Sequence, residues 1–167
     1  MLLVNQIQIE LLKLIVVLFQ LHKLKLVFLY SIIVGATGTG LQLSAWLIDA
    51  GTEVTLVDSS ENKCRTVERQ LGSITVVGEP TNVETLIQSG IERADLLITT
   101  LPTDHANFLI SSIAKVVFNT PQVISVVNTV ESKNIFSIMG INETIDAVGL
   151  VSENIEEKIA DLLIEEV

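Results

Sequence analysis

The chain has 167 residues, enough for one domain with a complete hydrophobic core. Its composition is 49% hydrophobic but only 4% aromatic, a balance typical of buried parallel strands rich in Val, Ile and Leu. The net charge of −10 argues against a nucleic-acid partner, because phosphate backbones are bound by clustered Lys and Arg. The single cysteine, Cys64, excludes an internal disulfide and a cysteine-based zinc site. The two histidines lack ligand-like spacing, so no metal site is predicted.

Residues 1–25 are predicted to form an apolar, amphipathic helix ahead of the main domain. Its polar residues fall on one narrow helical stripe; they are Gln6, Glu10, Lys13, Gln20 and Lys23. A membrane span is marginal here, because residues 2–21 include six polar positions, and a secretory signal fits poorly. Three interpretations remain open: a helix buried in an oligomer interface, an interfacial membrane anchor, or the remnant of a pore-lining helix.

From residue 26 onward, predicted strands and helices alternate. The strands are expected at 27–34, 53–58, 74–77, 95–100, 122–127 and 145–148. The helices that follow them are expected at about 40–50, 60–71, 82–89, 104–118, 131–139 and from about 153 to the end. Because crossovers between parallel strands are right-handed, this alternation predicts an α/β fold over residues 26–167. We expect a doubly wound, Rossmann-like parallel sheet of order 3-2-1-4-5-6, with helices on both faces.

The first predicted strand ends in a glycine-rich loop. The loop reads Gly35, Ala36, Thr37, Gly38, Thr39, Gly40, and the next helix starts at its end. The unpaired N–H groups and the positive dipole end of that helix favour a phosphate. The dinucleotide fingerprint has glycine at its first, third and sixth positions, whereas Thr37 stands third here and the middle glycine has moved to Gly38. We predict a phosphate site whose pyrophosphate the Cβ of Thr37 would crowd; the alternative is a tight turn without a ligand.

Asp58 ends the second predicted strand, eighteen positions past Gly40. A carboxylate at this place accepts hydrogen bonds from ribose hydroxyls and repels a 2′-phosphate. Ser59 follows it, and no Arg stands beside it. NAD(H), or an adenosine nucleotide such as ATP or ADP, is therefore favoured over NADP. The alternative is that Asp58 only caps the next helix.

Three further motifs resemble one known family. They are Val76-Val77-Gly78-Glu79-Pro80-Thr81, Ser89-Gly90-Ile91-Glu92-Arg93-Ala94-Asp95 and Asp104-His105-Ala106-Asn107. Together they are similar to the N-terminal domain of the RCK family, also called KTN or TrkA-N, over about residues 31–157. This family is the nucleotide-sensing module of potassium channels and transporters.

The resemblance implies a role for each part of the site. The loop from Gly35 to Gly40 would hold the phosphates, and Asp58, with Ser59 beside it, the ribose. Gly78, Glu79 and Pro80 would flank the adenine, while Thr100 and Leu101 would border the far end of the nucleotide. The chain departs from the family pattern at Thr37, at Glu79, where the family has Asp, and at Val126, where many members carry an Arg. Losing that cation should weaken binding of a triphosphate more than binding of NADH.

The resemblance also implies a function. The chain is expected to be a cytoplasmic regulatory domain at the inner face of the membrane, without enzymatic activity. It would bind NAD(H) or ATP/ADP, pair into a homodimer or a higher ring, and pass the signal to a membrane potassium channel or transporter subunit. The nucleotide must then bind one packing of the domains better than the other.

Two other functions remain open from the sequence. An NAD-dependent reductase of the short-chain type also opens with Gly-Ala-Thr-Gly, but it needs a glycine where Leu41 stands. Such enzymes commonly use a Tyr with a Lys four residues on, and the only tyrosine, Tyr30, has no such partner. His105 beside Asp104 is the only acid–base candidate, and a helix-capping role is expected there. The third function is a dimerisation module without a ligand.

Overall fold

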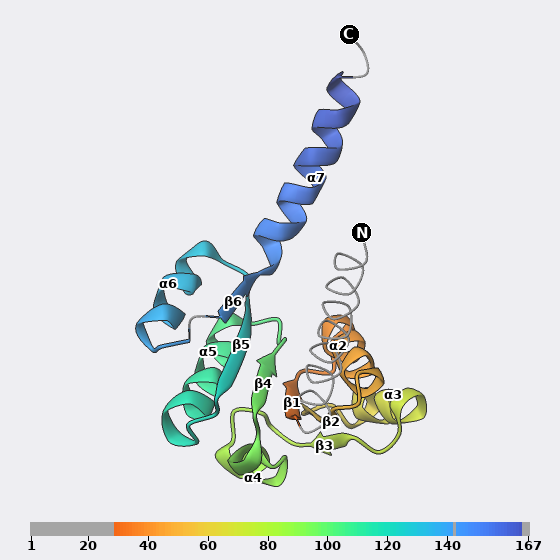
Figure 1. Ribbon diagram of the computed structural model, residues 1–167, viewed down its shortest axis with the longest axis vertical. Helices are drawn as coiled ribbons and strands as arrows, with labels where there is room; N and C mark the ends of the chain where they lie inside the picture. The colour runs from red at the N-terminus through yellow and green to blue at the C-terminus, as the bar shows by residue number, and fades with distance from the viewer. Residues whose placement is uncertain (1–28, 142, 165–167) are drawn as a thin grey trace, which may run out of the picture.

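The structure is a computed structural model that describes residues 29–141 and 143–164. It contains a six-stranded sheet (Figure 1) of order β3-β2-β1-β4-β5-β6 in which every pairing is parallel. The strands are β1 (Tyr30–Val34), β2 (Glu53–Asp58), β3 (Thr75–Val77), β4 (Leu96–Thr99), β5 (Gln122–Val127) and β6 (Glu143–Asp146). The predicted doubly wound order is confirmed.

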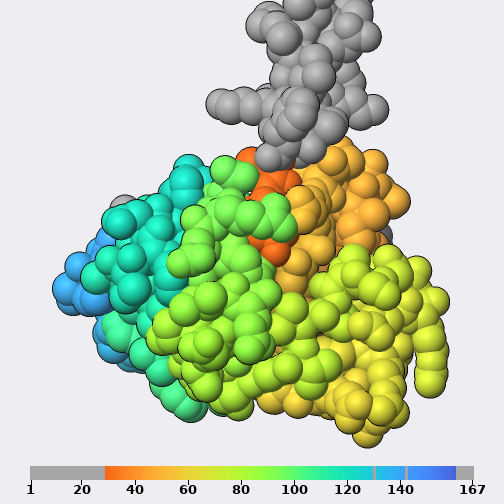
Figure 2. All heavy atoms as spheres, turned by 90° about the horizontal axis from the view of Figure 1, so that it is seen from below, coloured from red at the N-terminus to blue at the C-terminus, as the bar shows by residue number. Residues whose placement is uncertain are grey.

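Helices cover both faces of the sheet. They are α2 (Gly38–Asp49), α3 (Glu61–Leu71), α4 (Val83–Gln88), α5 (Asp104–Ser112), α6 (Val130–Ile138) and α7 (Ala147–Ile164), with a short 3₁₀ turn, η1 (Ile91–Arg93). Figure 2 shows α4 and the turn that follows it on the surface, with α3 and α5 on either side. In Figure 1, α7 projects away from the sheet as a long helix.

Two hydrophobic clusters, one on each face, hold the layers together. Alternate residues of β1 point to opposite faces, as a strand requires. Ile33 packs with Leu47 of α2 and Val67 of α3, whereas Ile32 packs with side chains of α4, α5 and α6. All five residues of β1 are buried, which explains why the strand reads as a continuous apolar run. The carboxyl end of this central strand therefore lies in a rigid frame.

The end of the sheet differs from the prediction. The sixth strand covers Glu143–Asp146 rather than 145–148, and α7 begins at Ala147 rather than near residue 153. The reason is a cap: Asp146 Oδ1 accepts a hydrogen bond from the Gly149 N–H (2.8 Å), so that the helix starts directly after the strand.

Two other boundaries also differ. The helix expected at 104–118 changes after Ser112 to a π-helical segment, η2 (Ile113–Val117), in which the Phe118 N–H donates to the Ile113 carbonyl (3.3 Å). The first strand begins at Tyr30 rather than at residue 27. The helix predicted over residues 1–25 lies outside the described residues. None of the helices within 29–141 and 143–164 has the length and apolarity needed to cross a membrane.

Candidate functional site

The three glycines of the loop after β1 have different structural roles. Gly35 has φ +111°, and a Cβ there would lie 2.8 Å from Thr100 Oγ1. A Cβ on Gly40 would lie well inside contact distance of the Gly35 carbonyl oxygen, so Gly40 allows α2 to pack closely on the loop. A Cβ on Gly38 would meet nothing within 4 Å. The fold therefore requires Gly35 and Gly40, while Gly38 leaves open space over the backbone.

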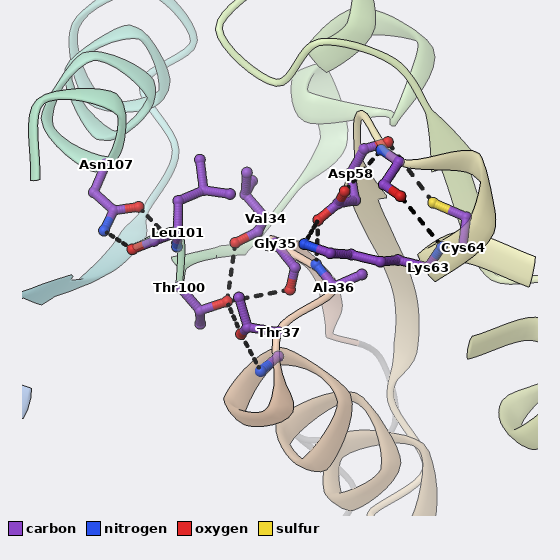
Figure 3. A network of polar contacts seen from close by, with 12 residues as sticks. Val34, Gly35, Ala36, Thr37, Asp58, Lys63, Cys64, Thr100, Leu101 and Asn107 are labelled. Carbon is purple, nitrogen blue, oxygen red and sulfur yellow. Dashed lines mark hydrogen bonds and ion pairs between the residues drawn. The ribbon is translucent and has the colours of Figure 1, made fainter. Parts of the chain in front are cut away.

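Thr37, at the unusual position of the fingerprint, caps α2 and ties the loop to β4. Its Oγ1 accepts a hydrogen bond from the Gly40 N–H (3.0 Å) and lies 3.0 Å from Thr100 Oγ1. Thr100 Oγ1 in turn donates to the carbonyl of Val34 (3.1 Å) or Gly35 (3.2 Å). Because the Thr100 proton is used in this way, the Thr37 hydroxyl is the donor between the two threonines. Figure 3 shows this chain of hydrogen bonds between the loop and the tip of β4.

The first turn of α2 presents free backbone donors. The first N–H groups of a helix have no partner inside it, and Thr37 satisfies only that of Gly40. Among the described residues, no protein acceptor bonds the N–H groups of Thr37, Gly38 or Thr39. Gly38 and the Thr39 side chain are exposed. The turn is therefore equipped to receive an anion.

Asp58, at the carboxyl end of β2, points toward this loop. Its side chain is buried, with Oδ2 accepting from the Ala36 N–H (2.8 Å) and Oδ1 from the Ser60 N–H (2.8 Å). The ammonium of Lys63 lies 3.9 Å from Oδ2 (Figure 3). The N-cap of α3 is Ser60, whose hydroxyl accepts from the Lys63 N–H (3.4 Å). The alternative that Asp58 caps this helix is therefore wrong.

The residues that follow β3 lie next to Asp58, because β3 pairs with β2. The Gly78 N–H donates to the Asp58 carbonyl (3.1 Å), and a Cβ on Gly78 would clash with Thr85 of α4 at 2.7 Å. Glu79 is exposed and accepts a hydrogen bond from Thr81 Oγ1 (3.0 Å), whereas Pro80 is buried. Ser59, like Glu79, is exposed at the strand ends. The structure thus brings the loop, Asp58 and the tip of β3 to one edge of the sheet.

At the tip of β4, Leu101 is held by a buried asparagine, Asn107, which belongs to the Asp104-His105-Ala106-Asn107 motif. The Leu101 N–H donates to Asn107 Oδ1 (3.0 Å), and Asn107 Nδ2 donates to the carbonyls of Leu101 (2.9 Å) and Val126 (2.9 Å). Asn107 has 0% exposure, and these partners satisfy the hydrogen-bonding groups of its side chain. It therefore fixes the tips of β4 and β5 to each other.

Asp104 supports the same region from the start of α5. Its Oδ1 accepts from the N–H and the side-chain Nδ2 of Asn128 (both 2.8 Å), and Oδ2 accepts from Thr129 Oγ1 (3.1 Å). Burial opposes its charge, but hydrogen bonds from Ser132, Asn128 and Thr129 outweigh that effect and lower the pKa of Asp104. The capping role expected for His105 beside Asp104 is wrong, because the N-cap of α5 is Thr103, with no side-chain cap. Asp104 bonds the loop after β5 instead.

A cleft of about 320 Å³ opens between the first turns of α2 and α3. This volume is at the small end of the range for ligand sites. The cleft is lined by Ala36, Thr37, Gly38, Leu41, Asn62, Lys63, Thr66 and Val67. Three of these residues, Asn62, Lys63 and Thr66, were not among the predicted site residues. The sequence signal that could have located them is that Asn62 and Lys63 stand one helical turn before Thr66, in the helix that follows the strand ending in Asp58.

Other side chains with acid–base or nucleophilic groups lie away from the loop or are inert. Tyr30 is at the amino end of β1, opposite the loop, where its hydroxyl bonds Ser89 and Thr55. Burial and the nearby Asp58 carboxylate raise the pKa of the Cys64 thiol, which therefore stays protonated at neutral pH. His105 lines a second, apolar cleft of about 320 Å³ between α5 and α6, with Phe108, Ile135 and Phe136. No cluster of three or more His, Cys, Asp or Glu suited to a metal occurs within the described ranges.

Comparison with known proteins identifies the family. Residues 31–147 match the TrkA-N domain. The chain belongs to the TrkA-N domain family. This range includes the glycine loop, Asp58 and the tips of β3 and β4, so the resemblance read from the motifs is confirmed.

One curated relative of this TrkA-N domain is the Trk system potassium uptake protein TrkA homolog of Methanothermobacter thermautotrophicus. The alignment with it has 141 positions, is 30% identical, and covers 81% of this chain and 65% of the relative. The chain thus spans less than two thirds of that protein's length.

Two solved structures share the fold of this TrkA-N domain. The Shewanella denitrificans Kef CTD in AMP-bound form superimposes with a TM-score of 0.70 and 16% identity, covering 80% of each chain. The GsuK channel bound to NAD gives a TM-score of 0.63 and 21% identity, covering 71% of this chain and 21% of the channel.

Proposed function

We propose that this TrkA-N domain is a nucleotide-binding regulatory module of a potassium transport system and has no enzymatic activity. The proposal is supported by the similarity to a TrkA homolog named for potassium uptake. It is also supported by the fold shared with one structure that holds AMP and one that holds NAD. The ligand is an adenine nucleotide of the NAD(H) or ATP/ADP class. The tyrosine that a short-chain reductase would use is not at this site, since Tyr30 lies at the other end of β1 from the loop.

The observation that carries the proposal is the free first turn of α2 beside the buried carboxylate of Asp58. The N–H groups of Gly38 and Thr39 bind the phosphate, and Asp58 accepts from the ribose hydroxyls. Lys63 supplies a cation at the same cleft, which matters in a chain with a net charge of −10. Ser59 and the segment Gly78 to Pro80 flank the adenosine, while Thr100 and Leu101 border the far end of the site.

The bound nucleotide acts on a membrane channel or transporter subunit through the packing of paired domains. It shifts gating only if it binds one packing better than the other. Pairing into a homodimer or ring is supported by α7, which carries a stripe of exposed apolar residues at helical spacing. This stripe comprises Val148, Val151, Ile155 and Ile159. The domain acts at the cytoplasmic face of the membrane.

The test is calorimetric binding of ADP and NADH to the full chain and to two variants. Asp58→Ala should weaken binding of at least one nucleotide by about tenfold or more, because two ribose hydrogen bonds are lost. Asp49→Ala is the matched control: it removes one carboxylate from the exposed, opposite end of α2 and should bind as the wild type does. Absence of binding to the folded wild type at millimolar nucleotide would refute the proposal. Steady oxidation of NADH with a carbonyl substrate would favour a reductase instead.

A further inference from the structure

A dinucleotide would have to cross the place where Thr37 and Thr100 meet. In a doubly wound sheet the strand order reverses between two central strands, here β1 and β4. A dinucleotide lies across the crevice at this point, with its adenosine over one half of the sheet and its second nucleoside over the other. The linking pyrophosphate passes over the third position of the glycine fingerprint, because a glycine there lets it approach the backbone.

In this chain that third position is Thr37, and its side chain closes the crossing. The Thr37 hydroxyl lies 3.0 Å from the Thr100 hydroxyl (Figure 3). This bond joins the loop after β1, in the first half of the sheet, to the tip of β4, in the second half. The bridge is held at both ends: Thr37 also accepts from the Gly40 N–H, and Thr100 donates to the carbonyl of Val34 or Gly35. It is therefore part of the cap of α2 and of the β1–β4 junction.

The cleft beside the glycine loop lies on one side of this bridge. The cleft of about 320 Å³ is lined by the loop after β1, by α2 and by α3, with no residue of β4, β5 or the segments that follow them. It contains the open backbone at Gly38 and the ammonium of Lys63. On the other side, Asn107 uses both the N–H and the carbonyl of Leu101 and the carbonyl of Val126. The Leu101 N–H, the donor at this strand tip, is therefore not available to a second nucleoside.

We propose that the site selects a mononucleotide, AMP or ADP, and discriminates against dinucleotides, with Thr37 as the specificity-determining residue. This inference rests on the proposed function and narrows it from the NAD(H) or ATP/ADP class to one adenosine with one or two phosphates. The phosphate remains on the side of β1 and β2, between the first turn of α2 and Lys63. Any group attached beyond it meets the threonine bridge.

The experiment compares three ligands that share the same ADP portion: ADP, ADP-ribose and NADH. Calorimetry on the full wild-type chain should give ADP an affinity about tenfold or more above those of ADP-ribose and NADH, with AMP close to ADP. Thr37→Ser keeps the hydroxyl and should retain the preference. Thr37→Gly restores the fingerprint and should lose the preference for ADP. Thr37→Ala breaks the bridge with less added flexibility but keeps the Cβ, so it should lose part of that preference. Glycine is a tolerated N-cap, and circular dichroism verifies folding of each variant.

The outcomes separate this inference from the proposed function. If the wild type binds NADH or ADP-ribose as tightly as ADP, the selectivity inference is wrong and the proposed function stands. The same holds if the folded Thr37→Gly and Thr37→Ala variants both keep the wild-type preference. If no variant and no wild-type protein binds any adenine nucleotide, the proposed function fails and the selectivity inference fails with it.

Discussion

Gly38 and Gly40 stand two residues apart in the first turn of α2, yet alanine should have opposite effects at the two positions. A Cβ at Gly40 would overlap the carbonyl oxygen of Gly35, which is backbone and cannot rotate away. Either α2 or the loop must move, and overpacking of this kind costs about 1–3 kcal/mol. A Cβ at Gly38 meets nothing within 4 Å, so alanine there should gain about 0.5–1 kcal/mol from helix propensity and a less flexible unfolded chain.

For Gly38→Ala, ADP affinity should fall although stability rises. If a phosphate approaches the open backbone there, the added methyl group occupies its place, and ADP affinity should fall by about tenfold although the protein is more stable. Urea unfolding followed by circular dichroism gives the stabilities, and calorimetry gives the affinities. Equal stability of the two variants would refute the packing assignment. Unchanged ADP affinity in Gly38→Ala would refute the phosphate assignment.

Three further substitutions test the frame around the site. Asp104→Asn should flatten the loss of stability in acid: the lowered pKa of Asp104 stabilises the fold above its unfolded pKa, and this gain disappears as the pH falls through the folded value. Urea titrations at several pH values measure the free energy of unfolding. The same loss of stability in acid for the variant and the wild type would contradict this prediction. Asn107→Ala should lower the free energy of unfolding by about 2–3 kcal/mol, since Leu101 loses its partners; a loss below about 1 kcal/mol would count against this role. Gly90→Ala forces a side chain into φ +79° and against the Tyr30 hydroxyl, so Tm should fall by several degrees, and an unchanged Tm would disprove the strain.

The sheet could be predicted because local signals agreed with the global pattern. Strands such as β1 are buried on both faces and read as uninterrupted apolar runs. Glycines also marked helix ends: Gly51, Gly72 and Gly140 have positive φ within two residues of the last residue of α2, α3 and α6. With the helices located, the right-handed crossover rule left few strand orders.

The boundary between β6 and α7 could not be read in the same way. Residues 145–150 are mostly small or apolar and suit a strand as well as a helix. The deciding contact is the cap that Asp146 makes with the Gly149 N–H, and a capping aspartate inside such a run resembles the end of a strand. The π-helical turn before Phe118 is also a tertiary effect, because Ile113 and Phe118 both pack against the core.

In the site, the positions were predictable but their connections were not. The fingerprint located the loop, and strand length located Asp58. That Asp58 bonds the Ala36 N–H, 22 residues earlier, depends on how β1 and β2 align. The bond between Thr37 and Thr100 spans 63 residues and depends on β4 lying beside β1. Lys63 lines the cleft because the first residues of α3 face the loop. Sequence spacing alone does not predict which way a helix faces.

Asp58 anchors the glycine loop through the Ala36 N–H, so this carboxylate serves the architecture as well as recognition. A nucleotide would meet a cradle that is already assembled, and docking would carry little entropic penalty from loop ordering. Because the loop is already held in place, we expect no disorder-to-order change there when a ligand arrives. Under the proposed function, we therefore expect the signal to leave the pocket as a displacement of α2 and α3, whose first turns line the cleft.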